Sequence, residues 1–341
     1  MRRIQFFGGL LIVLTVLTSC EKEEPLYPQP KVAAGIQTQI FEMGETYENQ
    51  LFFDFESQQT YTSKFGLWDI GVACQGEPHF VICSGKNSEF SAAMIEDVSF
   101  ENLHTIDLNT LDWEFDHPSG NKDSLAFNGC FVKTSNGYSG LLNRSYILNL
   151  GDKDLLDQQY IKIKPISAVG GVYEFLWGYL ADSSSTYLTR IFTKPVQNYA
   201  YYSFINKNLI NNEPVENNKW DIVFTTYKEM IPDVDGTIYP YIIRGVLSNS
   251  NKVKVTQINN GTSFDEMSIS IAVGLNYDDN LDVIGYDWKE YSQSAGKYTI
   301  VPNQYYVIKT TNNNYFKMRF VDFYDDQGRK GYPKMAWELM K

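Results

Sequence analysis

The sequence has few of the residues that catalytic and metal sites most often use. Only three histidines occur, His79, His104 and His117, so none lies beyond residue 117. Because Ser-His-Asp and Cys-His sites need an imidazole, such a site is excluded from the second half of the chain. The sequence also lacks a P-loop, a GxGxxG loop, an HExxH motif and a GxSxG nucleophile elbow. These absences favour a binding protein over an enzyme.

Cysteine is also scarce, and its positions do not form a metal-binding pattern. The four cysteines are Cys20, Cys74, Cys83 and Cys130, with no CxxC pair and no Cys/His spacing typical of zinc. In an oxidising compartment, Cys74 and Cys83 are candidates for a disulfide between neighbouring strands, which leaves Cys130 buried and free.

Basic residues are outnumbered by acidic ones, 29 to 41, and the formal net charge is −12. Binding to nucleic acid requires clustered lysine and arginine, so this charge argues against a nucleic-acid partner. After the N-terminal segment, no apolar run is long enough to cross a bilayer. Any contact with a membrane is therefore expected through a lipid anchor only.

The N-terminus has the pattern of a bacterial lipoprotein signal. Arg2 and Arg3 precede a short apolar stretch that ends in "LTSC", a small-residue cleavage site followed by a cysteine. We expect a signal peptide over residues 1–19 and acylation of the Cys20 thiol, with a plain secretory signal as the alternative. The acidic tether over residues 20–35 contains "EKEEP", which resembles an export signal for the outer face. The sequence therefore predicts a lipid-anchored outer-membrane protein, exposed at the cell surface.

Aromatic residues are abundant, with 24 Tyr, 21 Phe and 6 Trp. They occur in short, often alternating segments such as "WDIVFTTY", "YIIRGVLS" and "YFKMRFVDFY", which polar turns such as "NNEPVENNK" separate. The best helix candidate is "SFDEMSISIAV". The sequence thus predicts a mainly β fold of antiparallel sheets with few helices.

The two halves of the sequence are similar to each other. "FFDFES…KFGLWDIGV" at 52–72 aligns with "YYSFIN…NNKWDIVF" at 201–224, and both contain "WDI". A second tryptophan beside an aspartate, and then a closing pair of strands, follow in each half. Chance matches between short β segments are the alternative explanation. A duplication predicts two related β domains, over residues 36–180 and 199–341.

The aspartates of the two "WDI" motifs, Asp69 and Asp221, are candidates for acid–base catalysis. Such chemistry needs a partner carboxylate or a perturbed environment in a cleft, and no second acid is duplicated at a constant distance from both. Since strand residues alternate, the aspartate points away from its apolar neighbours. We therefore expect Asp221 at the surface or capping a turn.

A second acidic stretch, "VDFYDDQGRKGYP", lies near the C-terminus and contains Asp322, Asp325 and Asp326. A calcium loop needs acids at alternate positions, and this stretch lacks that alternation. Aspartate can bond its own backbone and Gly328 can adopt a positive φ. The stretch therefore predicts a tight turn between two strands.

Four side chains are candidates to hold a ligand. His104 and His117 flank "TIDLNTLDWEFD", and Met267 and Tyr291 hold comparable places in the second half. Imidazole, thioether and phenolate groups are axial ligands of haem iron. The alternative is an ordinary position for each: two loop histidines facing water, a packed methionine and a loop tyrosine. No spacing rule decides between the two interpretations.

Several motifs of the second half together resemble a known family. "YYSF", "WDIVFTTY", "IRGVLSN", "VIGYDWK", "YYVIKT" and "YFKMRFVDFYDDQGRKGYP" follow one another as in HmuY-like lipoproteins, over residues 199–341. "LWDIGV" makes the first half look like a diverged copy. The resemblance implies a surface lipoprotein that captures haem and passes it to a TonB-dependent transporter of the outer membrane.

The resemblance also implies paired histidine or methionine ligands in loops of the domain. Since no histidine follows residue 117, Met267 and Met230 are the substitutes near the relevant loops. Cobalamin is the alternative cargo, and either macrocycle needs an aromatic, mostly apolar cleft. A further alternative is a glycan-binding or adhesion module, in which two domains give avidity.

Overall fold

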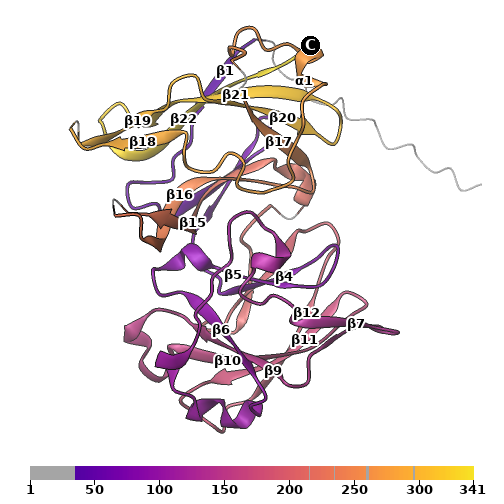
Figure 1. Ribbon diagram of the computed structural model, residues 1–341. Helices are drawn as coiled ribbons and strands as arrows, with labels where there is room; N and C mark the ends of the chain where they lie inside the picture. Colours follow the sequence, from indigo (N-terminus) through magenta and orange to yellow (C-terminus); the bar gives the residue numbers. More distant parts are fainter. Residues whose placement is uncertain (1–34, 215, 234, 259–260, 295) are drawn as a thin grey trace, which may run out of the picture. The chain divides into compact units, whose positions relative to one another are not determined.

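Short strands rich in aromatic and β-branched residues make up most of the regular structure (Figure 1). The computed structural model describes residues 35–214, 216–233, 235–258, 261–294 and 296–341, which all belong to one compact unit. The strands pair antiparallel in several sheets, so the predicted mainly β fold is confirmed. The predicted signal peptide and Cys20 lie outside the described residues. Within those residues, no helix has the length and apolar character needed to cross a membrane.

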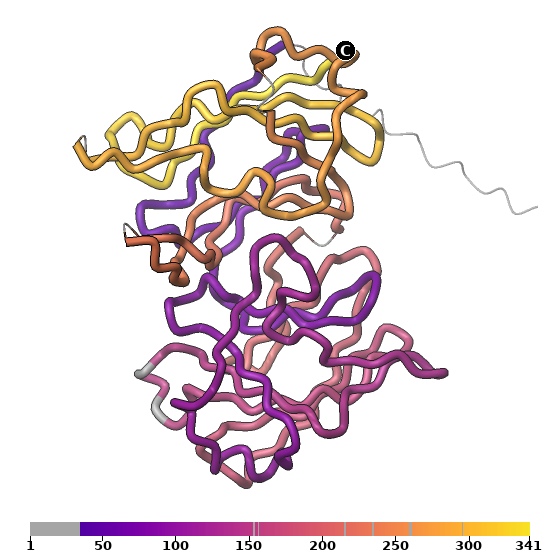
Figure 2. Tube along the Cα trace, viewed as in Figure 1, coloured from indigo at the N-terminus to yellow at the C-terminus, as the bar shows by residue number. Residues whose placement is uncertain are grey.

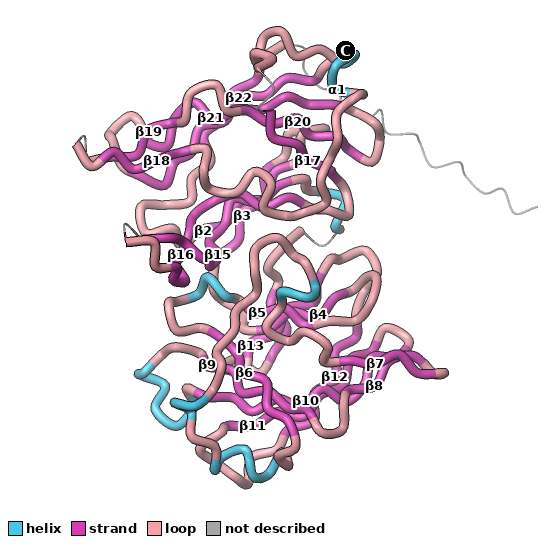
Figure 3. Tube along the Cα trace, viewed as in Figure 1, coloured by secondary structure: helices cyan, strands magenta, loops and turns pink. Residues whose placement is uncertain are grey.

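In the part of the chain that the structure describes, helical structure is limited to short turns (Figure 3). The α-helix α1 (Ile269–Ala272) lies inside the segment where the sequence predicted a helix. Short 3₁₀ helices connect strands elsewhere, at Ser84–Lys86, Phe100–Thr105, Leu108–Thr110, Lys122–Ser124, Lys153–Gln158 and Asn217–Lys219.

The first core lies between two sheets. The larger sheet contains β6 (Ser91–Glu96), β7 (Phe131–Thr134), β8 (Gly137–Gly140), β9 (Arg144–Asn149), β10 (Tyr160–Val169), β11 (Val172–Tyr179) and β12 (Tyr187–Phe192). The smaller sheet has the order β14 (Asn208–Ile210), β13 (Tyr199–Ser203), β4 (Ile70–Ala73), β5 (Phe80–Ile82). Aromatic side chains such as Phe80, Phe175 and Trp177 fill the space between them.

The second core is built in the same way. One sheet has the order β1 (Gln37–Ile40), β22 (Lys330–Leu339), β21 (Tyr315–Tyr324), β20 (Tyr305–Thr310), β17 (Val253–Ile258). The other has the order β16 (Ile238–Ser248), β15 (Ile222–Pro232), β2 (Asn49–Phe53), β3 (Thr60–Lys64). A separate hairpin, β18 (Lys289–Ser292) with β19 (Lys297–Ile300), packs against this core through Tyr298.

Each half of the sequence contributes strands to a sheet of the other half. In the first half, Ile70 of "WDI" lies opposite Tyr202, which belongs to the second half. In the second half, Ile222 of "WDI" lies opposite Phe53, which belongs to the first half. Figure 2 shows the indigo N-terminal strands running among the orange and yellow ones. Each predicted domain range, 36–180 and 199–341, therefore contributes strands to both cores.

A buried aspartate fixes each exchanged strand. Asp69 Oδ2 accepts a hydrogen bond from the Phe204 amide at 2.7 Å, and Asp221 Oδ2 accepts one from the Phe55 amide at 2.6 Å. Both carboxylates are fully buried, so the expected surface position of Asp221 is wrong, while the expected capping role is confirmed. The alternation placed Trp220 and Ile222 on one face, but they pack in different clusters, Trp220 beside Val223 and Ile222 in the second core. Nor could the alternation show that another strand end covers Asp221.

A lysine neutralises each of these aspartates. Lys86 Nζ lies 2.6 Å from Asp69 Oδ1, and Lys252 Nζ lies 3.1 Å from Asp221 Oδ1. Lys252 also pairs with Asp54, so two carboxylates share one ammonium group in the second core. There, burial raises the pKa of Asp221 to about 7, although Lys252 opposes the shift. We call each aspartate with its lysine and its capped amide a clasp.

The predicted turn near the C-terminus is confirmed as the connection between β21 and β22. Gly328 has a φ of +76°, a conformation that costs glycine little. Asp325 Oδ1 accepts hydrogen bonds from the amides of Gln327 and Arg329, at 3.0 and 2.8 Å. Its carboxylate also pairs with the Arg329 guanidinium at 2.6 Å. The acid thus stabilises the turn.

Cys74 and Cys83 do not form the candidate disulfide, and Cys130 is buried and free as expected. The register explains this: Cys74 follows the end of β4, whereas the Cys83 amide bonds Asp69 O, at the beginning of that strand. The four residues of β4 separate the two cysteines by roughly 13 Å. A disulfide requires Cα atoms within about 7 Å.

Candidate functional site

The structure places the predicted ligand residues in separate parts of the protein. Met267 is only 2% exposed and packs in a small core with Phe264 and Tyr305. Its thioether is therefore enclosed by other side chains. Met230, on β15, is 42% exposed, and Tyr291, on β18, is 55% exposed. Of the residues expected in the second half, these two present their side chains to solvent.

The two histidines contact different elements of the structure. His104 is exposed on a 3₁₀ helix, where its Nδ1 lies 2.8 Å from Glu101 O. His117 Nε2 lies 3.4 Å from a Glu229 carboxylate oxygen on β15. Met230 is the next residue of that strand, and successive strand residues point to opposite faces. The imidazole of His117 and the thioether of Met230 are therefore directed to opposite sides of β15.

A cavity lies where the hairpins β15–β16 and β18–β19 meet the second core. Its volume is about 190 Å³. It is lined by Tyr47, Tyr241, Ile242, Ile243, Arg244, Tyr286, Lys289, Tyr298, Phe323 and Lys330. We call it the hairpin cavity. Lys289 Nζ donates to Arg244 O at 2.8 Å, which joins the bases of the two hairpins.

The lining of the hairpin cavity is cationic and contains no acidic residue. Arg244 donates one hydrogen bond from Nη1 to Ile242 O at 3.1 Å, whereas its buried Nε has no hydrogen-bond partner. Lys289 is 9% exposed, and burial lowers its pKa to about 7. In the ion pairs of the described residues, none of Arg244, Lys289 and Lys330 has a carboxylate partner.

Aromatic rings take the place of carboxylates around these cations. The Arg244 guanidinium lies 4.8 Å from the Tyr47 ring centroid, and Lys289 Nζ lies 4.2 Å from that of Trp288. Lys330 Nζ lies 5.8 Å from the Tyr47 ring. Cation–π contacts stabilise a positive charge but leave its hydrogen-bond donors free. The cavity therefore offers free N–H donors between aromatic walls.

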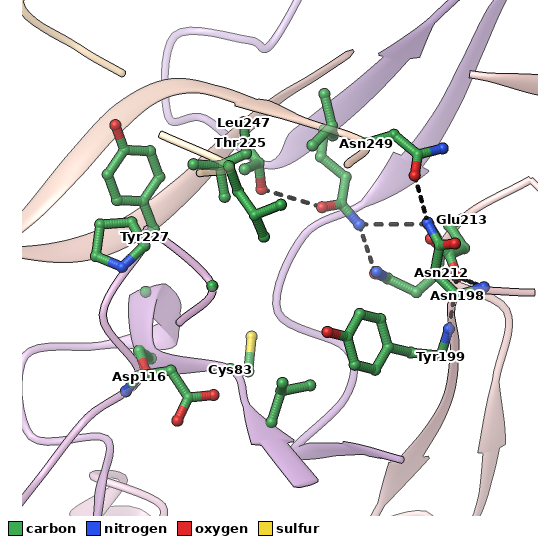
Figure 4. A pocket seen from close by; sticks show the side chains of 18 of the residues that line it. Cys83, Asp116, Asn198, Tyr199, Asn212, Glu213, Thr225, Tyr227, Leu247 and Asn249 are labelled. Carbon is green, nitrogen blue, oxygen red and sulfur yellow. Dashed lines mark hydrogen bonds between the residues drawn. The ribbon is translucent and has the colours of Figure 1, made fainter. Parts of the chain in front are cut away.

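A second cavity, of about 220 Å³, lies between the two four-stranded sheets (Figure 4). We call it the central cavity. Its amides bond one another: Thr225 Oγ1 donates to Gln50 Oε1 at 3.1 Å, and Gln50 donates to Asn212. Asn198 Nδ2 donates to Asn249 Oδ1 at 3.1 Å. These bonds connect β2 and β15 with the segments that flank β13 and β14.

The acids of the central cavity are also used by the protein itself. Asp116 accepts from the amides of Ile82 and Ala126 at 2.6 and 2.9 Å. Glu213 accepts from the two amides at the start of β13 at 3.2 and 3.1 Å. Burial raises the pKa of Asp116 and of Glu213 to about 7. Trp68 Nε1, Trp220 Nε1 and the Tyr227 hydroxyl also line the central cavity and have no hydrogen-bond partner, but they are neutral groups. Because the charged groups named above already have partners, we take the hairpin cavity, with its unpaired cations, as the better candidate for a charged ligand.

Arg244 and Lys289 were not predicted from the sequence as site residues. A local signal was present: "YIIRGVLS" contains one basic residue among mostly aliphatic neighbours, and "YDWKEY" contains one among aromatic and acidic neighbours. Nothing in the local pattern shows that these two bases meet, since residues 244 and 289 come from different hairpins. Only the packing of β18 beside β16 brings them together.

Comparison with known proteins places the hairpin cavity in a recognised domain. Residues 196–337 match the sequence model of the HmuY protein family, which confirms the resemblance predicted for residues 199–341. No curated protein matches the chain. Except for Tyr47, all residues lining the hairpin cavity fall in the matched range.

Solved structures with similarity to the chain share little sequence with it. A HmuY-like heme binding protein from Bacteroides vulgatus is 11% identical, with 89% of this chain and 91% of that chain covered and a TM-score of 0.23. Apo PinO from Porphyromonas gingivitis is 11% identical, with 91% and 99% covered and a TM-score of 0.26. The apo HmuY analog from Tannerella forsythia is 9% identical, with 91% and 97% covered and a TM-score of 0.26. The assignment of residues 196–337 rests on the sequence match.

Proposed function

We propose that this protein binds haem or a related tetrapyrrole as its cargo. The proposal starts from the match of residues 196–337 to the HmuY family. The protein acts in this proposal as a binding protein and not as an enzyme. The supporting observation is that the two hairpins that form the hairpin cavity also carry exposed side chains suited to bind a macrocycle. Met230, Tyr241 and Tyr291 are 42%, 50% and 55% exposed on the two hairpins whose bases form that cavity.

These side chains have the chemistry that a metal macrocycle needs. Tyrosine rings stack on flat aromatic systems, and Tyr291 stands beside Tyr298 with ring centroids 5.3 Å apart. Phenolate and thioether groups both ligate haem iron. Tyr291 and Met230 are therefore the proposed axial ligands. Met267 is not among the proposed ligands, since its side chain is 2% exposed and packs in a core.

Titration of the purified protein with haemin tests the proposal. We expect a shifted Soret band at micromolar haemin, and a weaker or displaced band in Tyr291→Phe and Met230→Leu. Matched controls are Tyr187→Phe and Met94→Leu, which change comparably exposed residues on β12 and β6. No shift in either iron redox state would contradict haem binding. Calorimetry with cobalamin then tests the alternative cargo.

We also propose that the protein is lipid-anchored at the cell surface and passes its cargo to a TonB-dependent transporter. This part is supported by the sequence, through "LTSC" at the predicted cleavage site and the acidic tether that follows. Replacing Cys20 by alanine should release the protein from the membrane and abolish labelling by radioactive palmitate. Growth on haemin that persists without the anchored protein would contradict the transport role.

A further inference from the structure

The hairpin cavity contains an unusual arrangement of charge. Burial lowers the pKa of Lys289 and Arg244 adds to this, whereas Asp287, which is outside the cavity lining, opposes the shift with a larger effect than that of Arg244. The lining itself thus holds three cationic side chains, with one carboxylate acting on Lys289 from outside it. Buried like charges are costly, and proteins normally place carboxylates beside them. Here the nearest acceptors are backbone carbonyls, at 2.8 Å from Lys289 to Arg244 O and 3.4 Å to Tyr286 O. The site therefore has an excess of positive charge and of free donors.

The free donors suit one kind of ligand group. A guanidinium presents its N–H groups in a plane, in a geometry that matches the two oxygens of a carboxylate. The buried Nε of Arg244 is one of these donors and has no hydrogen-bond partner. Lys289 and Lys330 add two ammonium groups to the same lining. At about 190 Å³, the cavity is smaller than the roughly 300–1,000 Å³ of sites that enclose a whole small molecule. It fits an acidic side chain of a larger ligand.

We propose that the hairpin cavity is a carboxylate-binding subsite, which takes the acidic arms of the cargo while its ring lies against the exposed tyrosines of the hairpins. This inference rests on the proposed function and narrows it to tetrapyrroles that carry free carboxylates at their rim. Arg244 binds the carboxylate, Lys289 and Lys330 neutralise the remaining charge, and the Tyr47 ring contacts both the Arg244 guanidinium and Lys330.

The test compares each acid with its ester. Haemin and protoporphyrin IX are titrated beside their dimethyl esters, which keep the ring but lose both charges. We expect the acids to bind about 10- to 100-fold more tightly than the esters, as for loss of a hydrogen bond to a charged group. In Arg244→Gln this preference should largely disappear, with ester binding unchanged. Arg190→Gln, an exposed arginine on β12, is the matched control and should keep it.

The outcomes separate the inference from the proposed function. Equal binding of acid and ester to the unchanged protein would overturn the subsite and leave tetrapyrrole binding intact. If the metal-free acid binds more tightly than its ester and haemin shows no iron ligation, the axial ligands are wrong and the subsite stands. If no tetrapyrrole binds, both proposals fail. Should Arg244→Gln fail to fold by circular dichroism, Lys289→Met provides the second variant, and a full acid preference in it would contradict the subsite.

Discussion

The segment that matches the HmuY family should not fold by itself, because strands from outside the match complete its core. Residues 196–337 lack β1, β2 and β3. These strands and the residues beside them carry Phe41, Phe53 and Phe55, which are fully buried in the second core. Without them, side chains such as Phe224 lose their partners, since Phe41 stacks on Phe224 at 4.1 Å. We predict that a fragment of residues 196–341 is largely unfolded.

The size of the loss follows from burial. A fully buried phenylalanine contributes about 1.5–3 kcal/mol, so the three together contribute roughly 5–9 kcal/mol. Met43 and Leu51 are also buried in this core, and the clasp of Asp221 loses the Phe55 amide. Whole domains are stable by only about 5–15 kcal/mol. The loss is therefore as large as the entire stability of a typical domain.

Two further fragments make the test decisive. In the first fragment, a flexible linker joins residues 36–66 to residues 214–341. The second fragment is the same except that the amino-acid order of residues 36–66 is scrambled. Circular dichroism and urea unfolding should show a cooperative transition for the first and none for the second. A cooperative transition of residues 196–341 alone, with a stability above about 5 kcal/mol, would refute the reasoning.

Three smaller changes test other parts of the structure. Asp69→Asn breaks the clasp of the first core and should lower the free energy of unfolding by about 3 kcal/mol in urea, whereas adding Lys86→Met should recover much of this loss. Glu213 has a raised pKa of about 7, so its contribution to stability is present at low pH and is lost as the pH rises through 7. Asp116 and Asp221 also have pKa values raised to about 7 and contribute a loss of the same sign. Glu213→Gln should therefore reduce the stability lost between pH 5 and pH 8 by about 3 kcal/mol, and an unchanged pH dependence would contradict the assignment. Gly245→Ala places a Cβ 2.6 Å from Gly285 O and should destabilise the base of the β15–β16 hairpin by about 1–3 kcal/mol, seen as a lower Tm.

The features predicted correctly from the sequence are those that depend on neighbouring residues. Alternation and turn chemistry located the hairpin around Gly328, and the segment containing α1 was found from its composition. The features that were missed depend on contacts between distant residues. Asp69 meets an amide 135 positions away, and no local pattern specifies which strand end covers a given face. The same reason explains why the hairpin cavity was not found.

The exchange of strands also bears on what the first half of the chain does. If it were only a spacer, the segment that matches the HmuY family would contain the whole lining of the hairpin cavity. Instead, Tyr47 comes from the first half, lines the hairpin cavity and places its ring against Arg244 at 4.8 Å. The segment that carries it is held by β2, which pairs with β15 of the HmuY domain. Through β2 the first half contributes to the second core, and through Tyr47 it contributes to the lining of the hairpin cavity. If the hairpin cavity is the site proposed above, both halves of the chain are needed to form it.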